Sequence, residues 1–170
     1  MTTVRPTIGL FAGIFNSDGK LLVKRRPQNE SLPGDWDLPG GGVEENAAKE
    51  ILNERIIASE LAREVGEEIG LEVESMIQPM PAMYPATLSD KDWAFVVIIG
   101  VVNETPTKGE YKYVSPAELM ELAEASVGNR LVSGIGKRMH RMCLRVLASR
   151  DSPNEKYREE AAKMLHRVQI

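Results

Sequence analysis

Two apolar, β-branched-rich runs open the chain at residues 7–15 and 21–25, and the turn-forming residues NSDG separate them. Because Asn, Asp and Gly readily adopt the backbone conformations of tight turns, this pattern predicts a β-hairpin. The next segment, RRPQNESLPGDWDLPGGG (25–42), contains three prolines and several glycines. It predicts a loop with a short extended piece at Trp36 to Leu38.

A helix is expected next, because no proline interrupts the chain from Asn46 to Ile69 and good helix formers dominate there. Asn46 is the expected N-cap of this helix, and Gly70 is the expected C-cap. One face carries an apolar stripe formed by Leu61, Val65 and Ile69. Ile56 and Ile57 fall outside this stripe, which argues against an unbroken helix over the whole range.

Strands and loops alternate in the rest of the chain. We expect a strand near 71–77, a Pro/Met-rich loop over 78–90, a strong strand over 93–102 and a short strand over 111–114. SPAE (115–118) is a capping box with proline at the first helical position, and SPNE (152–155) repeats this signature, so two or three C-terminal helices should follow. The mixed order predicts an α/β fold, and the absence of repeats or linkers in the sequence favours a single domain over residues 1–170.

Composition and charge narrow the classes of function. The formal net charge of -4, from 21 basic and 25 acidic residues, gives no electrostatic reason to bind a nucleic-acid polymer or an anionic membrane. No apolar run in the sequence approaches membrane-spanning length. The single cysteine, Cys143, excludes an internal disulfide, and the N-terminal apolar run fits a first strand better than a signal peptide. We therefore expect a cytoplasmic protein.

The segment REVGEEIGL (63–71) concentrates acidic residues on one face of the expected helix. At about 100° per residue, Glu64, Glu67 and Glu68 fall on one arc beside the apolar stripe. Each like-charge pair at this spacing costs about 0.2–0.5 kcal/mol, and Gly66 costs about 1 kcal/mol more than alanine within a helix. Arg63 can pair with Glu67 but cannot neutralise the whole cluster.

Two interpretations of this acidic face stay open on the residues alone. A solvated surface is the usual fate of a charge run. A divalent-cation site is the alternative, because Mg²⁺ takes oxygen ligands and shares its octahedron with substrate phosphates. Upstream, Gly40, Gly41 and Gly42 carry no side chain, so their backbone can be approached closely. Loop and helix together favour the metal site.

These two segments resemble the signature of the Nudix hydrolases, G-x5-E-x7-R-E-U-x-E-E-x-G-U, in which U is a bulky aliphatic residue. REVGEEIGL (63–71) satisfies every position of the second half, and WDLPGG (36–41) is similar to the approach to the first half. The hairpin, the strand at 93–102 and YVSPAEL (113–119) are also similar to the layout of the family.

The resemblance implies an α/β/α sandwich with a mixed β-sheet that hydrolyses the diphosphate linkage between a nucleoside and another moiety. Carried over by position, Glu64, Glu67, Glu68 and the Gly41 carbonyl would be ligands of Mg²⁺, for which Mn²⁺ could substitute. Arg63 would orient these acids, and catalysis would involve Arg63, Glu64 and Glu67. The expected partner is a small nucleotide. Homodimers are common in the family, but no feature of this sequence demonstrates one.

The sequence departs from the signature in its spacing. The pattern places its first glycine and its arginine 14 positions apart, whereas Gly41 and Arg63 are 22 positions apart, so about eight residues are inserted. Counting back from Arg63 to the position of the upstream glutamate leads to Arg55. The candidates for that glutamate are Glu44, Glu45, Glu50 and Glu54, of which Glu50 has the better helical angle. The general base is open among Glu67, these four residues, Glu104 and Glu110.

The approach GDWDLPGG (34–41) looks more like the nucleoside-triphosphate, MutT-type branch of the family than the ADP-ribose branch. We therefore expect a nucleoside triphosphate to be cleaved to a monophosphate and pyrophosphate, with NDP-sugars or ADP-ribose as the alternative. Arg25 and Arg26, at the end of a strand, could hold phosphates, although a solvated strand end explains them equally well.

Two rivals belong to other classes. A catalytically silent nucleotide sensor would be expected to have lost some of the signature acids, which are intact here. An isoprenoid diphosphate isomerase would need a catalytic cysteine near the sheet, and Cys143 lies in a late helical stretch.

Overall fold

The computed structural model describes residues 8–30, 32–43, 54–72, 86–89, 92–102, 104–128 and 134–167. The strands in these ranges are β1 (Ile8–Phe15), β2 (Leu21–Arg25), β3 (Trp36–Asp37), β4 (Gly40–Gly42), β5 (Ala86–Ser89), β6 (Asp92–Val101) and β7 (Tyr111–Val114). The helices are α2 (Glu54–Ile69), α3 (Pro116–Gly128), α4 (Lys137–Leu147) and α5 (Glu155–Arg167). None of these helices is long and apolar enough to cross a membrane.

The strands form one mixed sheet. Its main path has the order β3-β2-β1-β6-β5, while β4 pairs with β1 and β7 pairs with β2. β1 and β6 run parallel, and the other paired strands run antiparallel. Parallel neighbours need a long crossover connection, and α2 lies in the segment of the chain that connects this pair.

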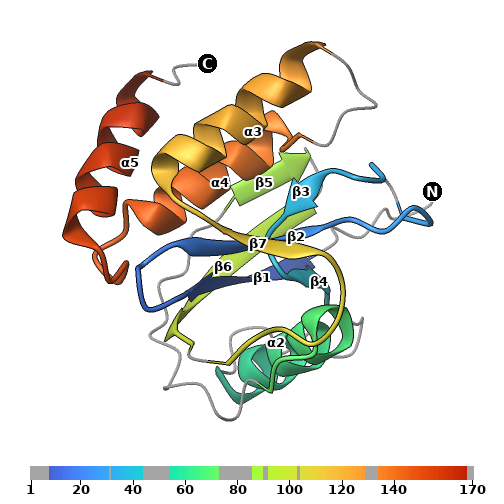
Figure 1. Cartoon of the computed structure of the whole chain (residues 1–170). Helices are drawn as coiled ribbons and strands as arrows, with labels where there is room; N and C mark the ends of the chain where they lie inside the picture. The colour runs from blue at the N-terminus through green and yellow to red at the C-terminus, as the bar shows by residue number, and fades with distance from the viewer. Residues whose placement is uncertain are drawn as a thin grey trace.

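Helices cover both faces of the sheet (Figure 1). On one face, the stripe of Leu61, Val65 and Ile69 on α2 packs into a core that includes Leu10, Ala12 and Ile14 of β1. On the other face, buried residues of α3, α4 and α5 pack against Phe11 and Phe15 of the same strand. Because successive side chains of a strand point to opposite faces, β1 contributes to both cores. The expected α/β/α sandwich with a mixed sheet is confirmed.

Several expected elements are confirmed. The hairpin is present, with Phe15 opposite Leu21, and the short strand over 111–114 has the expected bounds. The strong strand runs from Asp92 to Val101. The two or three helices expected near the C-terminus are α3, α4 and α5.

Helix α2 ends where the sequence predicts. Gly70 has a φ of 69°, the left-handed conformation that favours glycine after a helix. The Ile69 carbonyl accepts hydrogen bonds from the backbone N–H groups of Thr107 (2.9 Å) and Lys108 (3.1 Å). The helix is continuous from Glu54 to Ile69, and whether it also extends without a break from Asn46 stays a prediction, because 44–53 lie outside the described residues. The expected N-cap, Asn46, lies outside the described residues.

Two expectations about strands are wrong in part, and a third is tested only at its first two residues. The segment 78–90 was expected to be a loop, but Ala86–Ser89 forms the short strand β5, which pairs antiparallel with β6. The glycine segment was expected to be a loop, but Gly40–Gly42 forms β4 and pairs with β1. A strand was also expected near 71–77. Residues 71 and 72 are not part of a strand, and 73–77 lie outside the described residues.

The start of α5 also differs from the expectation. SPNE predicted Ser152 as the N-cap, but the helix begins at Glu155, and the Asn154 side chain accepts a hydrogen bond from the Tyr157 N–H (3.2 Å). Asn154 Nδ2 also donates to the Asp18 carbonyl (2.9 Å). Asn is as good an N-cap as Ser, and this second bond to the β1–β2 turn favours Asn154.

The SPAE capping box forms at the start of α3. Ser115 Oγ accepts from the Glu118 N–H (3.3 Å), and Glu118 Oε2 accepts from the Ser115 N–H (2.7 Å). Lys20 Nζ donates to Glu118 Oε1 (2.9 Å) and so connects the hairpin to the helix. The Ser115 N–H, with help from Lys20, lowers the pKa of Glu118 below its ordinary value of 4.5.

This capping box predicts a pH-dependent effect on stability. A carboxyl group whose pKa is lowered by folding stabilises the protein above its unfolded pKa, and it loses that contribution as the pH falls through the folded value. We expect Glu118→Gln to lower the free energy of unfolding by roughly 0.5–1 kcal/mol at pH 7. The difference from wild type should shrink below pH 4.5. Urea unfolding at several pH values would measure both.

Glu121→Gln is the matched control, because Glu121 is an exposed acid on the same helix. A loss of stability for Glu118→Gln that is the same at every pH, or the same as for Glu121→Gln, would contradict this account of the cap.

Candidate functional site

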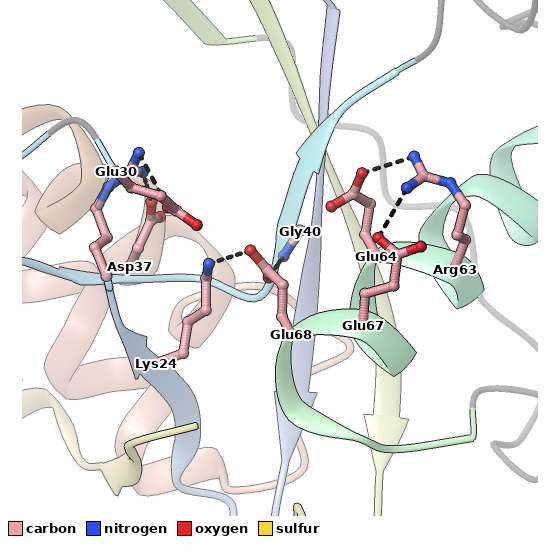
Figure 2. Close-up of polar contacts among 9 residues, drawn as sticks. Lys24, Glu30, Asp37, Gly40, Arg63, Glu64, Glu67 and Glu68 are labelled. Carbon is pink, nitrogen blue, oxygen red and sulfur yellow. Dashed lines mark hydrogen bonds and ion pairs between the residues drawn. The ribbon is translucent and has the colours of Figure 1, made fainter. Parts of the chain in front are cut away.

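The C-terminal half of α2 lies against the glycine strand β4. Glu68 points from the helix toward the sheet, where its Oε2 accepts a hydrogen bond from the Gly40 N–H (2.7 Å) (Figure 2). Its Oε1 accepts from the ammonium group of Lys24, which comes from β2. The side chain of Glu68 is 17% exposed and that of Lys24 only 6%. Burial raises the pKa of Glu68, and the Lys24 and Gly40 donors offset part of that rise.

Arg63 holds the other acids of the helix. Its guanidinium donates to Glu64 Oε1 (2.7 Å), Glu60 Oε2 (3.1 Å) and Glu67 Oε2 (3.1 Å). The bond to Glu60 and the charge of the neighbouring carboxylates raise the pKa of Arg63, so it stays a fixed cation. The predicted pairing of Arg63 with Glu67 is present in the structure, and Figure 2 shows Glu64 and Glu67 both turned toward the arginine.

Glu64 lies directly beside the glycine strand. A methyl group built on Gly41 would overlap the Glu64 carboxylate, whereas one built on Gly42 would meet nothing within 4 Å. Gly40 has a φ of 139°, and a side chain there would overlap the Leu10 carbonyl of β1. The absence of side chains at Gly40 and Gly41 is therefore what lets β4 pair with β1 on one side and receive the acids of α2 on the other.

The two arginines expected near phosphates are both paired with carboxylates of the protein. Arg25 Nη1 donates to both oxygens of Glu110 (3.1 and 3.0 Å), and Arg25 Nε donates to the Gly34 carbonyl (3.3 Å). Arg26 donates to Asp37 Oδ2 (2.7 Å) and lies 3.6 Å from Glu30. Their role in phosphate binding stays a prediction.

Lys24, Asp37 and Glu60 were missed by the sequence reasoning. Lys24 and Asp37 lie opposite each other on β2 and β3, and both are buried. Burial raises the pKa of Asp37, against the effect of Arg26. The signal in the sequence was a charged residue among apolar ones: Lys24 follows Val23, and Asp37 lies between Trp36 and Leu38. Glu60 lies three positions before Arg63 on the same helix, and this spacing was the signal for their contact.

Cys143 lies on the other side of the sheet. It is fully buried in the core between the sheet and α3, α4 and α5, and burial raises the pKa of its thiol well above the ordinary value. A buried, protonated thiol on the face opposite the acids argues against the isomerase alternative.

The donor set on this face suits a hard divalent cation. Glu64, Glu67 and Glu68 supply carboxylate oxygens, and the Glu64 carboxylate lies beside the backbone of Gly41. Carboxylate and backbone carbonyl oxygens are the ligands that Mg²⁺ and Mn²⁺ prefer. Each of these acids already contacts a cation: the Lys24 ammonium group contacts Glu68, and the Arg63 guanidinium contacts the other two. Within the described part of the chain, however, no three acidic, His or Cys side chains already gather as a metal cage. A bound ion would compete with Lys24 or Arg63 for its ligands.

Comparison with known proteins shows a family of domains that this chain matches. The model of the NUDIX domain family matches residues 4–141. Among curated proteins, no significant match was found.

Solved structures share the fold. The MutT protein from Methanosarcina mazei Go1 superposes with a TM-score of 0.61 at 24% identity, covering 85% of this chain and 96% of that chain. DR0079 from Deinococcus radiodurans gives 0.59 at 20% identity, covering 84% and 87%. The C-terminal domain of mouse MUTYH, solved in a complex with human PCNA, gives 0.55 at 14% identity, covering 84% and 87%.

The close approach of Gly41 to Glu64 yields a test of the metal site. We expect Gly41→Ala to displace the Glu64 carboxylate and to weaken Mn²⁺ binding by about tenfold or more, because outer contacts of metal ligands are typically worth 10–100-fold in affinity. Electron paramagnetic resonance of free Mn²⁺ would measure the affinity. Thermal unfolding should show that the variant keeps its fold.

Gly42→Ala is the matched control, since the same methyl one residue along meets nothing within 4 Å. Equal Mn²⁺ affinities for the two variants would remove Gly41 and Glu64 from the proposed metal site.

Proposed function

The chain belongs to the NUDIX family and is a Nudix pyrophosphohydrolase, and from this membership we propose that it hydrolyses nucleoside triphosphates with Mg²⁺ to give a monophosphate and pyrophosphate. Hydrolysis of pyrophosphate bonds in nucleoside diphosphate derivatives, with the help of divalent metal ions, is general to the family. The choice of a triphosphate rests on the GDWDLPGG approach to the glycine strand, which resembles the MutT-type branch.

The observation that carries the proposal is the position of the α2 acids on β4. Glu64 lies against Gly41, and Glu68 accepts the N–H of Gly40. We assign Glu64, Glu67, Glu68 and the Gly41 carbonyl as the Mg²⁺ ligands. When bound, the ion would neutralise the diphosphate and lower the pKa of a coordinated water.

Arg63 has a positioning role in this proposal. It contacts Glu60, Glu64 and Glu67 at once, so its single planar group fixes the relative orientation of acids on two turns of the helix. Fixing ligands before the substrate arrives reduces the ordering that catalysis would otherwise require.

The general base stays a proposal among several acids. We favour Glu67, because its side chain is 64% exposed and can reach a water, whereas Glu64 is 16% exposed. Glu110 is held by Arg25 through both carboxylate oxygens. Glu54 lies at the first residue of α2, while Glu44, Glu45 and Glu50 lie outside the described residues. Homodimerisation, a cytoplasmic location and a single domain over the whole chain also stay predictions.

The experiment that tests this function follows products by ³¹P NMR with Mg²⁺. Deoxynucleoside triphosphates, ADP-ribose and NDP-sugars would be offered separately to the wild-type protein. We expect pyrophosphate from a triphosphate, and a loss of about 10²–10⁴-fold in kcat for Glu67→Gln if this residue takes the proton from water. Glu159→Gln, an exposed acid on α5, is the matched control and should keep full activity.

The products decide between the alternatives. Two monophosphate products from an NDP-sugar or ADP-ribose, with triphosphates untouched, would replace the proposed substrate class by the alternative one. No turnover of any compound by folded protein that binds Mg²⁺ would contradict the proposal and favour a nucleotide sensor. Full activity of Glu67→Gln would move the base to another acid.

A further inference from the structure

A buried lysine lies between two buried carboxylates that belong to different parts of the fold. Lys24 donates from β2 to Glu68 of α2, and it is the cross-strand neighbour of Asp37 on β3. The exposed fractions of the Lys24 and Asp37 side chains are only 6% and 7%. A buried ammonium group is stable only where a negative partner compensates it, so the partner of Lys24 must be accounted for in every state of the site.

Glu68 cannot bind Lys24 and a divalent cation equally well. Both of its oxygens already accept hydrogen bonds, one from Lys24 and one from the Gly40 N–H. The Gly40 N–H is a neutral donor and is compatible with a bound ion. The ammonium group is a cation in direct contact with the same carboxylate, and like charges repel strongly in a buried setting. We therefore expect an ion that binds Glu68 to displace Lys24.

Asp37 offers the displaced ammonium a second partner. Its Oδ2 accepts from Arg26 (2.7 Å), but its Oδ1 is buried and accepts no hydrogen bond from a side chain in the described ranges. A buried acceptor without a strong donor is destabilising. Directly opposite residues on antiparallel strands have Cβ atoms only about 4.5–5.5 Å apart, which is well within the reach of a lysine side chain.

We propose that Lys24 and Asp37 are positioning residues of the metal site, with Lys24 bound to Glu68 in the metal-free protein and transferred to Asp37 Oδ1 when a divalent cation binds Glu68. This inference rests on the proposed metal site, but it does not depend on which nucleotide is cleaved. Lys24 keeps Glu68 compensated before the ion arrives. Asp37 lowers the cost of releasing Glu68, because the ammonium group exchanges one buried carboxylate for another and satisfies the free acceptor.

A double-mutant cycle on Mn²⁺ affinity in the absence of nucleotide tests this proposal. The proteins are wild type, K24M, D37N and K24M/D37N, and free Mn²⁺ is measured by electron paramagnetic resonance. We expect K24M to bind Mn²⁺ about tenfold more tightly, because the competing cation is gone, and D37N to bind about tenfold more weakly. Adding D37N to K24M should change the affinity by less than about threefold, because no ammonium then needs Asp37.

The cycle separates this role from a purely structural one. D37N also disturbs the pair with Arg26, but that effect is present in both backgrounds and cancels. An equal loss in both backgrounds, or weaker Mn²⁺ binding by K24M, would overturn the proposal. K24Q, which removes the charge but keeps a hydrogen-bond donor, replaces K24M if that variant does not fold.

A second measurement uses the wild-type protein without any change to Asp37. Saturation with diamagnetic Mg²⁺ should shift the ¹³Cγ resonance of Asp37, because Oδ1 gains a charged donor, and the shift should be absent in K24Q. An Asp37 resonance that does not respond to Mg²⁺ in wild type would overturn the transfer of Lys24.

Failure of this inference can be told apart from failure of the proposed function. Turnover of a triphosphate without coupling between Lys24 and Asp37 would reject only the inference. Coupling without turnover of any nucleotide would support the inference and reject the proposed substrate. Wild-type protein that binds no Mn²⁺ would reject the metal site and the inference together.

Discussion

The site depends on the contact between the end of one helix and a strand of three glycines. α2 can bring Glu64 against the sheet only because Gly41 has no side chain to displace its carboxylate, while a side chain on Gly40 would overlap β1. The same glycines let β4 pair with β1, whose other residues fill the cores on both sides of the sheet. The position of the acids is thus set by the packing of the whole sandwich.

Charges of alternating sign compensate the acids in the metal-free protein. Arg26, Asp37, Lys24 and Glu68 follow one another along one edge of the site, and Arg63 joins the remaining glutamates. An uncompensated cluster of carboxylates would destabilise α2, because each like-charge pair opposes the helix. Lys24 and Arg63, the two cations that contact these acids of α2, reduce that penalty, and a divalent ion would have to compete with them.

The second half of the family signature could be predicted from the sequence, because its residues lie on one continuous helix. A period of 3.6 residues fixes which side chains share a face, so the arc of Glu64, Glu67 and Glu68 and the pair of Arg63 with Glu67 followed directly. The capping box at Ser115 and the end of α2 at Gly70 are equally local, since each depends on a few consecutive residues.

Features that depend on distant segments could not be predicted in this way. The partnership of Lys24 with Glu68 joins residues 44 positions apart, and it exists only because the sheet and α2 pack together. The strand Ala86–Ser89 has a weak pattern of its own and is stabilised by its neighbour β6. Ser152 and Asn154 were both acceptable N-caps locally, and the contact of Asn154 with the Asp18 carbonyl favours one of them.

The inserted residues in the signature leave the acidic face of α2 intact for a physical reason. The apolar stripe of Leu61, Val65 and Ile69 anchors the last turns of α2 in the core, and these turns carry Glu64 and Glu68. Extra residues before Glu54 do not change the register between this stripe and the acids, because that register is internal to the helix. The spacing between Gly41 and Arg63 can therefore grow while the approach of Glu64 to Gly41 is kept. What the insertion does change is the upstream glutamate, whose position by count is taken by Arg55, so the candidates for it remain Glu44, Glu45, Glu50 and Glu54.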